Sequence, residues 1–64
     1  MKVTLEIRCD NAAFNEGGYG PGYEVARILE RLAGEVRDYL GDNVLMDGNG
    51  NRVGYFAVFK EGSE

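Results

Sequence analysis

The chain has 64 residues, which is enough for one small domain with a single hydrophobic core and leaves no room for a second domain or an enclosed cofactor cavity. Eleven acidic residues against seven basic ones give a net charge of −4, and the few lysines and arginines are scattered. Since proteins that hold nucleic acid neutralise phosphates with clustered basic side chains, we expect no direct nucleic-acid binding. An acidic protein of this kind suits docking on a basic partner surface.

Cysteine content and hydropathy bear on the location of the protein. Cys9 is the only cysteine, which excludes an internal disulfide and a multi-cysteine metal site. A secreted chain this short would need such cross-links, so the cytoplasm is the expected compartment. No apolar stretch approaches the roughly 18 residues of a membrane span, and residues 1–9 alternate instead of forming the apolar segment of a signal peptide. Neither export nor membrane anchoring is therefore expected.

Residues 1–9 predict a β-strand with one buried face, because their hydropathy alternates with a period of two. Val3, Leu5, Ile7 and Cys9 fall on the apolar side, and the residues between them are polar. We expect Cys9 to be buried as a small hydrophobic side chain.

A glycine-rich loop is predicted over residues 15–22, NEGGYGPG, after a short apolar patch that tucks Phe14 under the edge of the core. Three alternate glycines of this loop stand where phosphate-binding loops occur, between a strand and a helix. Their spacing matches neither the dinucleotide fingerprint nor the P-loop, which also needs a lysine. The alternative is a loop that presents Tyr19 and Tyr23 to a partner, since tyrosine gives a large contact area at modest entropy cost.

An amphipathic helix is predicted over residues 23–40, because at about 100° per residue its apolar side chains fall within one arc of roughly 120°. These side chains are Val25, Ile28, Leu29, Leu32, Val36, Tyr39 and Leu40. The opposite side is charged, with Glu24 and Arg27, and Arg31 and Glu35, spaced to form ion pairs along the helix. We expect this side to be solvated.

A β-hairpin is predicted over residues 43–60, because the Asp-Gly and Asn-Gly dipeptides at 47–50 favour the positive φ angles of a tight turn. The residues from Asp47 onward also match the first positions of a calcium-binding loop. The sixth and twelfth positions of such a loop need Gly and Glu, and here they hold Arg52 and Val58. We therefore expect a plain turn.

These elements predict one α+β domain over residues 1–64, with β-α-β-β order and a solvated tail at residues 61–64. The helix must cover one face of a three-stranded antiparallel sheet, because it has no other surface against which to bury its apolar side. We expect the first and third strands to pair, with the short second strand at an edge.

The last strand is apolar on both sides, and one helix can cover only one of them. We favour Gly54, Phe56 and Val58 on the helix side, because a glycine there would let the helix approach closely. Tyr55 and Phe59 then stand on the open face, together with the other odd-numbered residues of the strand. With the opposite facing, Phe56 and Val58 become the exposed pair. Exposed rings either strengthen cross-strand pairs or mark a protein contact or a homodimer interface.

Catalytic chemistry has little support in the sequence. The chain has no histidine, which excludes a Ser-His-acid triad and leaves Cys9 without a base. The loop carboxylates Asp10, Glu16, Asp42 and Asp47 show no spacing that would bring two of them together in an apolar pocket, as an acid–base pair needs. We therefore expect no enzyme activity, no cofactor and no metal ion.

Three segments of the chain carry a resemblance: CDNAAF at 9–14, EVARIL at 24–29 and GNRVG at 50–54. Together they are similar to a group of short uncharacterised proteins encoded by bacteriophages and prophages. The glycine-rich stretch 17–22 is longer than in that group, so no role of that loop carries over. The resemblance implies an accessory factor that binds a host protein. Some such factors, the anti-CRISPR proteins, inhibit bacterial defence complexes by blocking basic nucleic-acid-binding surfaces.

The sequence and the resemblance together predict a non-enzymatic protein-binding module in the cytoplasm of a bacterial host, which inhibits a host complex by covering a basic surface. The residues expected to contact the partner are Tyr55, Phe59, Tyr19 and Tyr23. One alternative is a self-associating structural module with the open sheet face as a homodimer interface. A less favoured alternative is an ion-binding domain that uses loop carboxylates.

Overall fold

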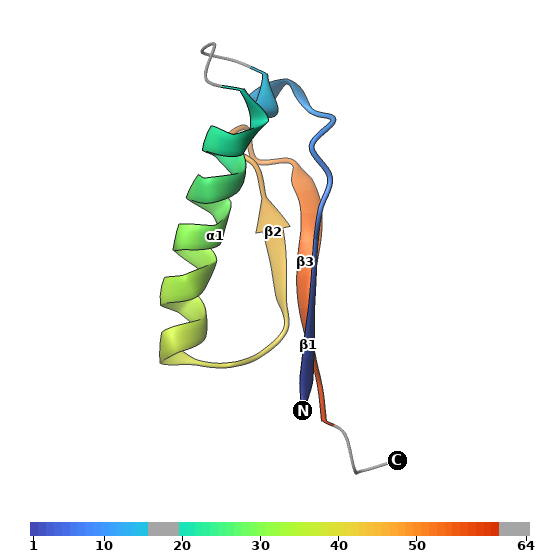
Figure 1. Cartoon of the computed structure of the whole chain (residues 1–64), viewed down its shortest axis with the longest axis vertical. Coiled ribbons are helices and arrows are strands. Elements are labelled where there is room, and N and C mark those ends of the chain that lie inside the picture. Colours follow the sequence, from blue (N-terminus) through green and yellow to red (C-terminus); the bar gives the residue numbers. More distant parts are fainter. Residues whose placement is uncertain (16–19, 61–64) are drawn as a thin grey trace.

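The computed structural model describes residues 1–15 and 20–60 and places one long helix against a three-stranded sheet (Figure 1). The elements are β1 (Lys2–Ile7), the 3-10 helix η1 (Ala12–Phe14), α1 (Pro21–Asp38), β2 (Asn43–Met46) and β3 (Arg52–Phe59). The strand order is β1-β3-β2, and both pairings are antiparallel. The predicted α+β fold with β-α-β-β order is confirmed, as is the edge position of the short second strand. The predicted tail and Tyr19 lie outside the described residues.

β1 pairs with β3 along its whole length, from Lys2 opposite Phe59 to Ile7 opposite Gly54. A Cβ atom at Gly54 would collide with the backbone carbonyl oxygen of Glu6. The close approach of β1 therefore requires the glycine, and our expectation that it makes room for the helix is wrong.

β1 ends two residues before the predicted strand does. The Arg8 amide still donates to the Val53 carbonyl oxygen at 2.7 Å, just beyond the last residue of the strand. Cys9 lies past this point, where strand alternation no longer sets the direction of its side chain, and it is exposed. The predicted burial of Cys9 is therefore wrong.

A β-bulge in β3 changes the predicted facing of one residue. β2 pairs with β3 through Leu45 opposite Gly54 and then Met46 opposite Arg52, so Val53 is skipped. An extra residue of this kind disrupts the alternation of the strand, and the Val53 side chain is buried in the core. Our expectation that all odd-numbered residues of this strand share the open face is wrong at this position.

α1 begins at Pro21, two residues earlier than predicted, with Gly20 as its N-cap at a φ of 79°. Proline suits the first helical position because its fixed φ is helical and its missing amide hydrogen would have no partner there. The helix ends at Asp38, also two residues earlier than predicted, and Tyr39 is extended and exposed instead of buried. None of the helices in the described ranges has the length and apolar character that crossing a membrane needs.

The hydrophobic core lies between α1 and the sheet. Its buried members are Phe14, Ile28, Leu32, Leu45, Val53 and Phe56. Phe14 has no exposed surface, so η1 contributes to the centre of the core rather than to its edge. Phe56 is buried and Tyr55 is exposed, which confirms the favoured facing of the last strand.

β1 is only half covered by the helix. On its helix-facing side Val3 is 46% and Leu5 is 45% exposed, and Leu29 on α1 and Leu40, which follows the helix, are exposed to a similar extent. All four were expected to be buried. The difference arises because α1 packs beside β2, and β2 and β1 are opposite edges of the sheet (Figure 1).

Candidate functional site

The open face of the sheet is the side that α1 does not cover. Alternate residues of the three strands form it: Lys2, Thr4 and Glu6 from β1, Val44 and Met46 from β2, and Tyr55, Ala57 and Phe59 from β3. In Figure 1 α1 stands on one side of the sheet only, and no described helix lies on the other.

Three exposed apolar side chains on this face, Val44, Tyr55 and Phe59, form what we call the aromatic strip. Val44 lies opposite Tyr55, and Phe59 follows on the same face of β3. Tyr55 is 40% and Phe59 is 50% exposed. The Lys2 ammonium nitrogen lies 5.7 Å from the centroid of the Phe59 ring, close enough for a cation–π contact. Two of the residues predicted to contact a partner thus share one surface.

The charges around the aromatic strip are mainly basic. Among the described residues Lys2, Arg8 and Arg52 border it, against the two acidic residues Glu6 and Asp42. Arg8 and Arg52 line one shallow pocket together with Tyr55, and neither forms an ion pair with another described residue. The local charge is therefore opposite in sign to the net charge of the chain.

Tyr23 lies apart from the aromatic strip. It occupies the first turn of α1, on the other side of the sheet, and is well exposed. Tyr19 lies outside the described residues. Of the four residues predicted to contact a partner, the structure groups only Tyr55 and Phe59.

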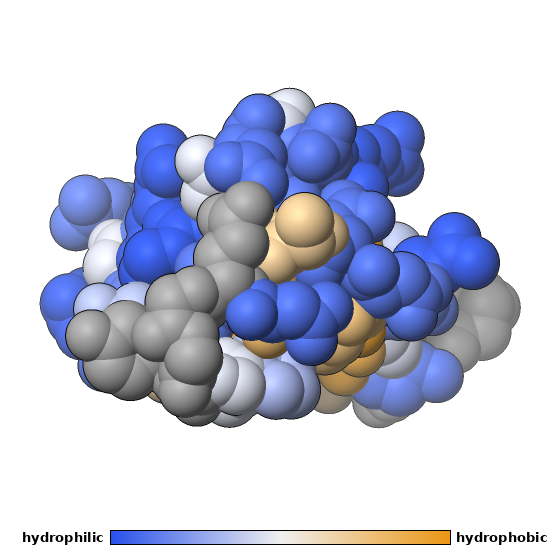
Figure 2. Space-filling view, turned by 90° about the horizontal axis from the view of Figure 1, so that it is seen from above, coloured by the Kyte–Doolittle hydropathy of each residue, from blue (hydrophilic) through white to orange (hydrophobic). Residues whose placement is uncertain are grey.

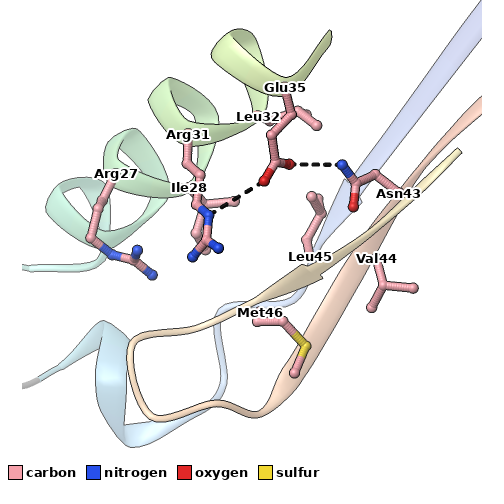
Figure 3. Close-up of a pocket in the computed structure, with 9 residues that line it drawn as sticks. All are labelled: Arg27, Ile28, Arg31, Leu32, Glu35, Asn43, Val44, Leu45 and Met46. Atoms are coloured by element: carbon pink, nitrogen blue, oxygen red, sulfur yellow. Dashed lines mark hydrogen bonds and ion pairs between the residues drawn. The ribbon is translucent and has the colours of Figure 1, made fainter. Parts of the chain in front are cut away.

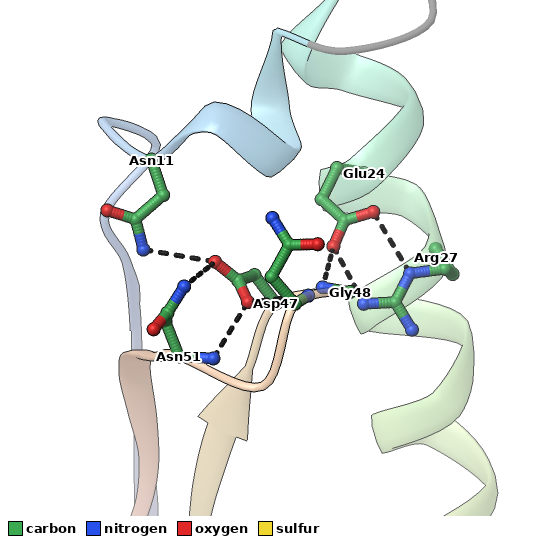
Figure 4. A network of polar contacts seen from close by, with 7 residues as sticks. Asn11, Glu24, Arg27, Asp47, Gly48 and Asn51 are labelled. Carbon is green, nitrogen blue, oxygen red and sulfur yellow. Dashed lines mark hydrogen bonds and ion pairs between the residues drawn. The ribbon is translucent and has the colours of Figure 1, made fainter.

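A polar network fixes the hairpin turn (Figure 4). The Asp47 carboxylate accepts hydrogen bonds from the backbone N–H of Asn51 at 2.8 Å and from the backbone N–H of Asn49 at 2.9 Å. It also accepts one from the Asn11 side chain at 3.0 Å. The hydrogen bond from the Asn51 amide is the main reason that the pKa of Asp47 lies below its usual range; burial opposes the shift. The Gly50 amide closes the predicted turn on the Asp47 carbonyl oxygen at 3.1 Å. The Asp47 carboxylate oxygens, which a calcium loop would use as ligands, are thus already hydrogen-bonded to the turn and to Asn11.

Glu24 links the helix to that turn. Its carboxylate accepts hydrogen bonds from Arg27 Nε at 3.0 Å and Nη2 at 2.7 Å, and from the Gly48 amide at 2.7 Å. The Arg27 hydrogen bonds are the main cause of a lowered pKa of Glu24, burial acts against them, and the Gly48 amide adds to the lowering. We predicted the pair with Arg27 but placed Glu24 on the solvated side, and its burial shows this to be wrong. At about 100° per residue Glu24 lies roughly 40° from Ile28, just outside the edge of the apolar arc, which is a signal that it borders the core.

These two carboxyl groups do not suit acid–base catalysis. Both pKa values are lowered, whereas a general acid needs a raised pKa. In the described ranges, every buried polar side-chain atom has a partner, and no group of three His, Cys, Asp or Glu residues could hold a metal ion. Figure 2, which looks onto the end of the molecule that carries the turn, shows a mainly hydrophilic surface. The network joins the turn to α1 and to the segment around Asn11, and its role is structural.

A small pocket lies between α1 and β2 (Figure 3). Its apolar lining includes Leu32 and Leu45. At its rim Asn43 donates to Glu35 at 2.7 Å, and Arg31 pairs with the same carboxylate at 3.5 Å. The polar groups of the rim are thus engaged with one another, and the aromatic strip is the stronger candidate for a functional site.

Comparisons of the chain with protein-family models, with curated proteins and with solved structures found no match. The candidate site therefore rests on its own geometry.

Proposed function

We propose that this protein is a non-catalytic protein-binding module that contacts its partner through the open face of its sheet. One observation supports the proposal above all: Tyr55, Phe59 and Val44 stand exposed together on a face that no described element covers. Aromatic side chains are enriched at the centre of protein interfaces, where they bury a large area at modest entropy cost.

The surroundings of the aromatic strip suit an interface. A polar and charged rim around an apolar centre is the common arrangement of protein contacts. Here Lys2, Arg8 and Arg52 outnumber Glu6 and Asp42 in the rim. These charges favour a partner surface with carboxylates around an apolar patch, since opposite charges steer association and fix orientation.

The net acidic charge favours a basic partner surface, but on the outer side of α1 Glu30 and Asp38 are interleaved with three arginines, so this side offers no acidic surface for it. Inhibition of a host defence complex, which the resemblance to phage proteins implies, stays a prediction. If that prediction holds, the partner is a host protein.

Affinity capture from a bacterial lysate tests the proposal with three immobilised proteins. They are the unmodified chain, the double variant Tyr55→Ser/Phe59→Ser, and a matched control, Tyr39→Ser, which removes a ring that is 79% exposed at the end of α1. We expect a protein that the unmodified chain and the control capture equally and that the double variant captures about tenfold less, since central aromatic residues dominate binding energy.

The captured protein should also elute with added salt, because the basic rim contributes screened attraction. Circular dichroism of each variant checks that the fold is intact. If no captured protein depends on the two rings, or if the control loses binding as strongly as the double variant, the open face is not the binding surface.

A further inference from the structure

The two edges of the sheet differ in how α1 borders them. Beside β2, the helix presents charged side chains: Asn43 donates to Glu35, and Arg31 pairs with the same carboxylate (Figure 3). Charged residues at a sheet edge discourage another strand from adding there. β1, the opposite edge, has six residues and is paired on one side only, with β3.

Apolar side chains lie exposed near the β1 edge, and we call them the β1 patch. Its members are Val3 and Leu5 on β1 and Leu29 on α1. At about 100° per residue, Leu29 lies about 120° from Glu35, on the other flank of the apolar side of α1 and therefore on the side toward β1. Exposed aliphatic residues on both β1 and α1 favour an occupant that supplies further aliphatic side chains.

The backbone of β1 is oriented to accept another strand. The Arg8 amide donates to the Val53 carbonyl oxygen, which makes this an exchanging pair of the antiparallel ladder. Such pairs alternate along a strand, so the even-numbered residues of β1 bond toward β3. The peptide groups of Val3 and Leu5 then point away from β3, toward the open edge.

The side-chain order of β1 is complementary to itself. In an antiparallel pair of two β1 strands centred on Thr4, Lys2 of one copy lies opposite Glu6 of the other, and Val3 lies opposite Leu5. Both charge pairs are attractive, and all four aliphatic side chains meet on the helix side of the sheet. Facing cross-strand pairs of this kind stabilise antiparallel strands.

The neighbouring registers that keep both helices on the same face are poorer. Centring the pair on Leu5 places Lys2 opposite Arg8, which is repulsive. Centring it on Val3 leaves Glu6 without a facing residue and places Lys2 opposite Thr4. The charges therefore select the register centred on Thr4.

We infer that a second copy of this chain occupies the β1 edge, with β1 pairing antiparallel to β1 around Thr4. The result is a six-stranded sheet with both helices on one face. Val3 and Leu5 of both copies lie between the two helices, where the Leu29 side chains pack over them. This interface lies at the strand edge and leaves the aromatic strip open, unlike a homodimer formed through the open face.

A charge exchange within β1 tests the inference by sedimentation velocity of the purified full chain from low micromolar to near-millimolar concentration. The unmodified chain should dimerise. Glu6→Lys places two lysines opposite each other at both ends of the pair and should weaken the dimer by about tenfold or more. The double variant Lys2→Glu/Glu6→Lys restores attraction in the same register and should recover the dimer.

Recovery by the double exchange is the decisive result, because a merely misfolded single variant would not be rescued by a second substitution at a solvated position. A chain that stays monomeric over the whole range overturns the inference, as does a double variant as weak as Glu6→Lys. Loss of the dimer in Tyr55→Ser/Phe59→Ser would place the interface on the open face instead. A monomeric result leaves the proposed binding function untouched, since that is measured by capture.

Discussion

Replacing Phe14 with alanine removes the most deeply buried side chain of the described residues. Phe14 has no exposed surface and packs in the core with Ile28 and Leu32 of α1 and Phe56 of β3. A buried phenylalanine changed to alanine costs about 3–5 kcal/mol of stability. At about 0.05–0.15 kcal/mol per residue, a chain of this length has a free energy of unfolding of about 3–10 kcal/mol. We therefore expect Phe14→Ala to lose between a third and all of its stability.

Denaturant unfolding followed by far-ultraviolet circular dichroism measures this loss. Phe59→Ala is the matched control, because it removes the same atoms from a ring that is 50% exposed. Its cost should be at most about 1.5 kcal/mol, half the value of a fully buried phenylalanine. Phe14→Leu keeps most of the buried volume and should cost about 1–2 kcal/mol, which keeps the test measurable if Phe14→Ala does not fold. Equal losses for the two alanine variants would refute the placement of η1 in the core.

Three further predictions concern the backbone and the polar network. Gly54→Ala should lower the free energy of unfolding by about 1–3 kcal/mol, because the new Cβ meets the Glu6 carbonyl oxygen. Gly34→Ala should raise it by about 0.5–1 kcal/mol in the same denaturation assay, because the helix gains propensity and the methyl group meets open space. The melting temperature should fall in acid. The pKa values of Glu24 and Asp47 are lowered in the folded chain, so both groups stabilise it fully above their unfolded pKa of about 4 and lose this effect as the pH drops through the folded values. A melting temperature unchanged down to about pH 2 would contradict the network.

The sequence predicts well those features that depend on neighbouring residues. The hairpin turn follows from Asp-Gly and Asn-Gly, and Gly50 does adopt a positive φ. The alternation of β1 is enough to place its residues on the two faces of the sheet. The facing of Tyr55 and Phe59 follows from the same period of two, which holds beyond the bulge.

Features that depend on distant contacts escape this reasoning. Val53 is buried because β2 and β3 pair with one residue skipped, and no local pattern marks the bulge. Phe14 stands in a patch without a period, so its depth depends on where α1 packs. Glu24 is buried because the turn brings the Gly48 amide to it. Its position relative to Ile28 is the one local sign of this.

The candidate site also has one part that depends on neighbouring residues and another that depends on distant contacts. The aromatic rings of the strip were predictable from β3 alone. Its basic rim was not, because Arg8 and Arg52 are far apart in the sequence and meet only through the pairing of β1 with β3. The overall charge of the chain therefore does not indicate the basic residues around the rings.

The pairing of Lys2 with Phe59 has a consequence for synthesis of the protein. β1 leaves the ribosome before β3 and finds its partner only when β3 has emerged. Until then α1, β2 and β3 can associate through contacts close in sequence, while β1 remains unpaired and its aliphatic side chains are exposed to water. Closing so long a loop is slow compared with forming a helix or a hairpin, so adding β1 is the step in which a nascent chain is open to chaperones and to other unfinished chains.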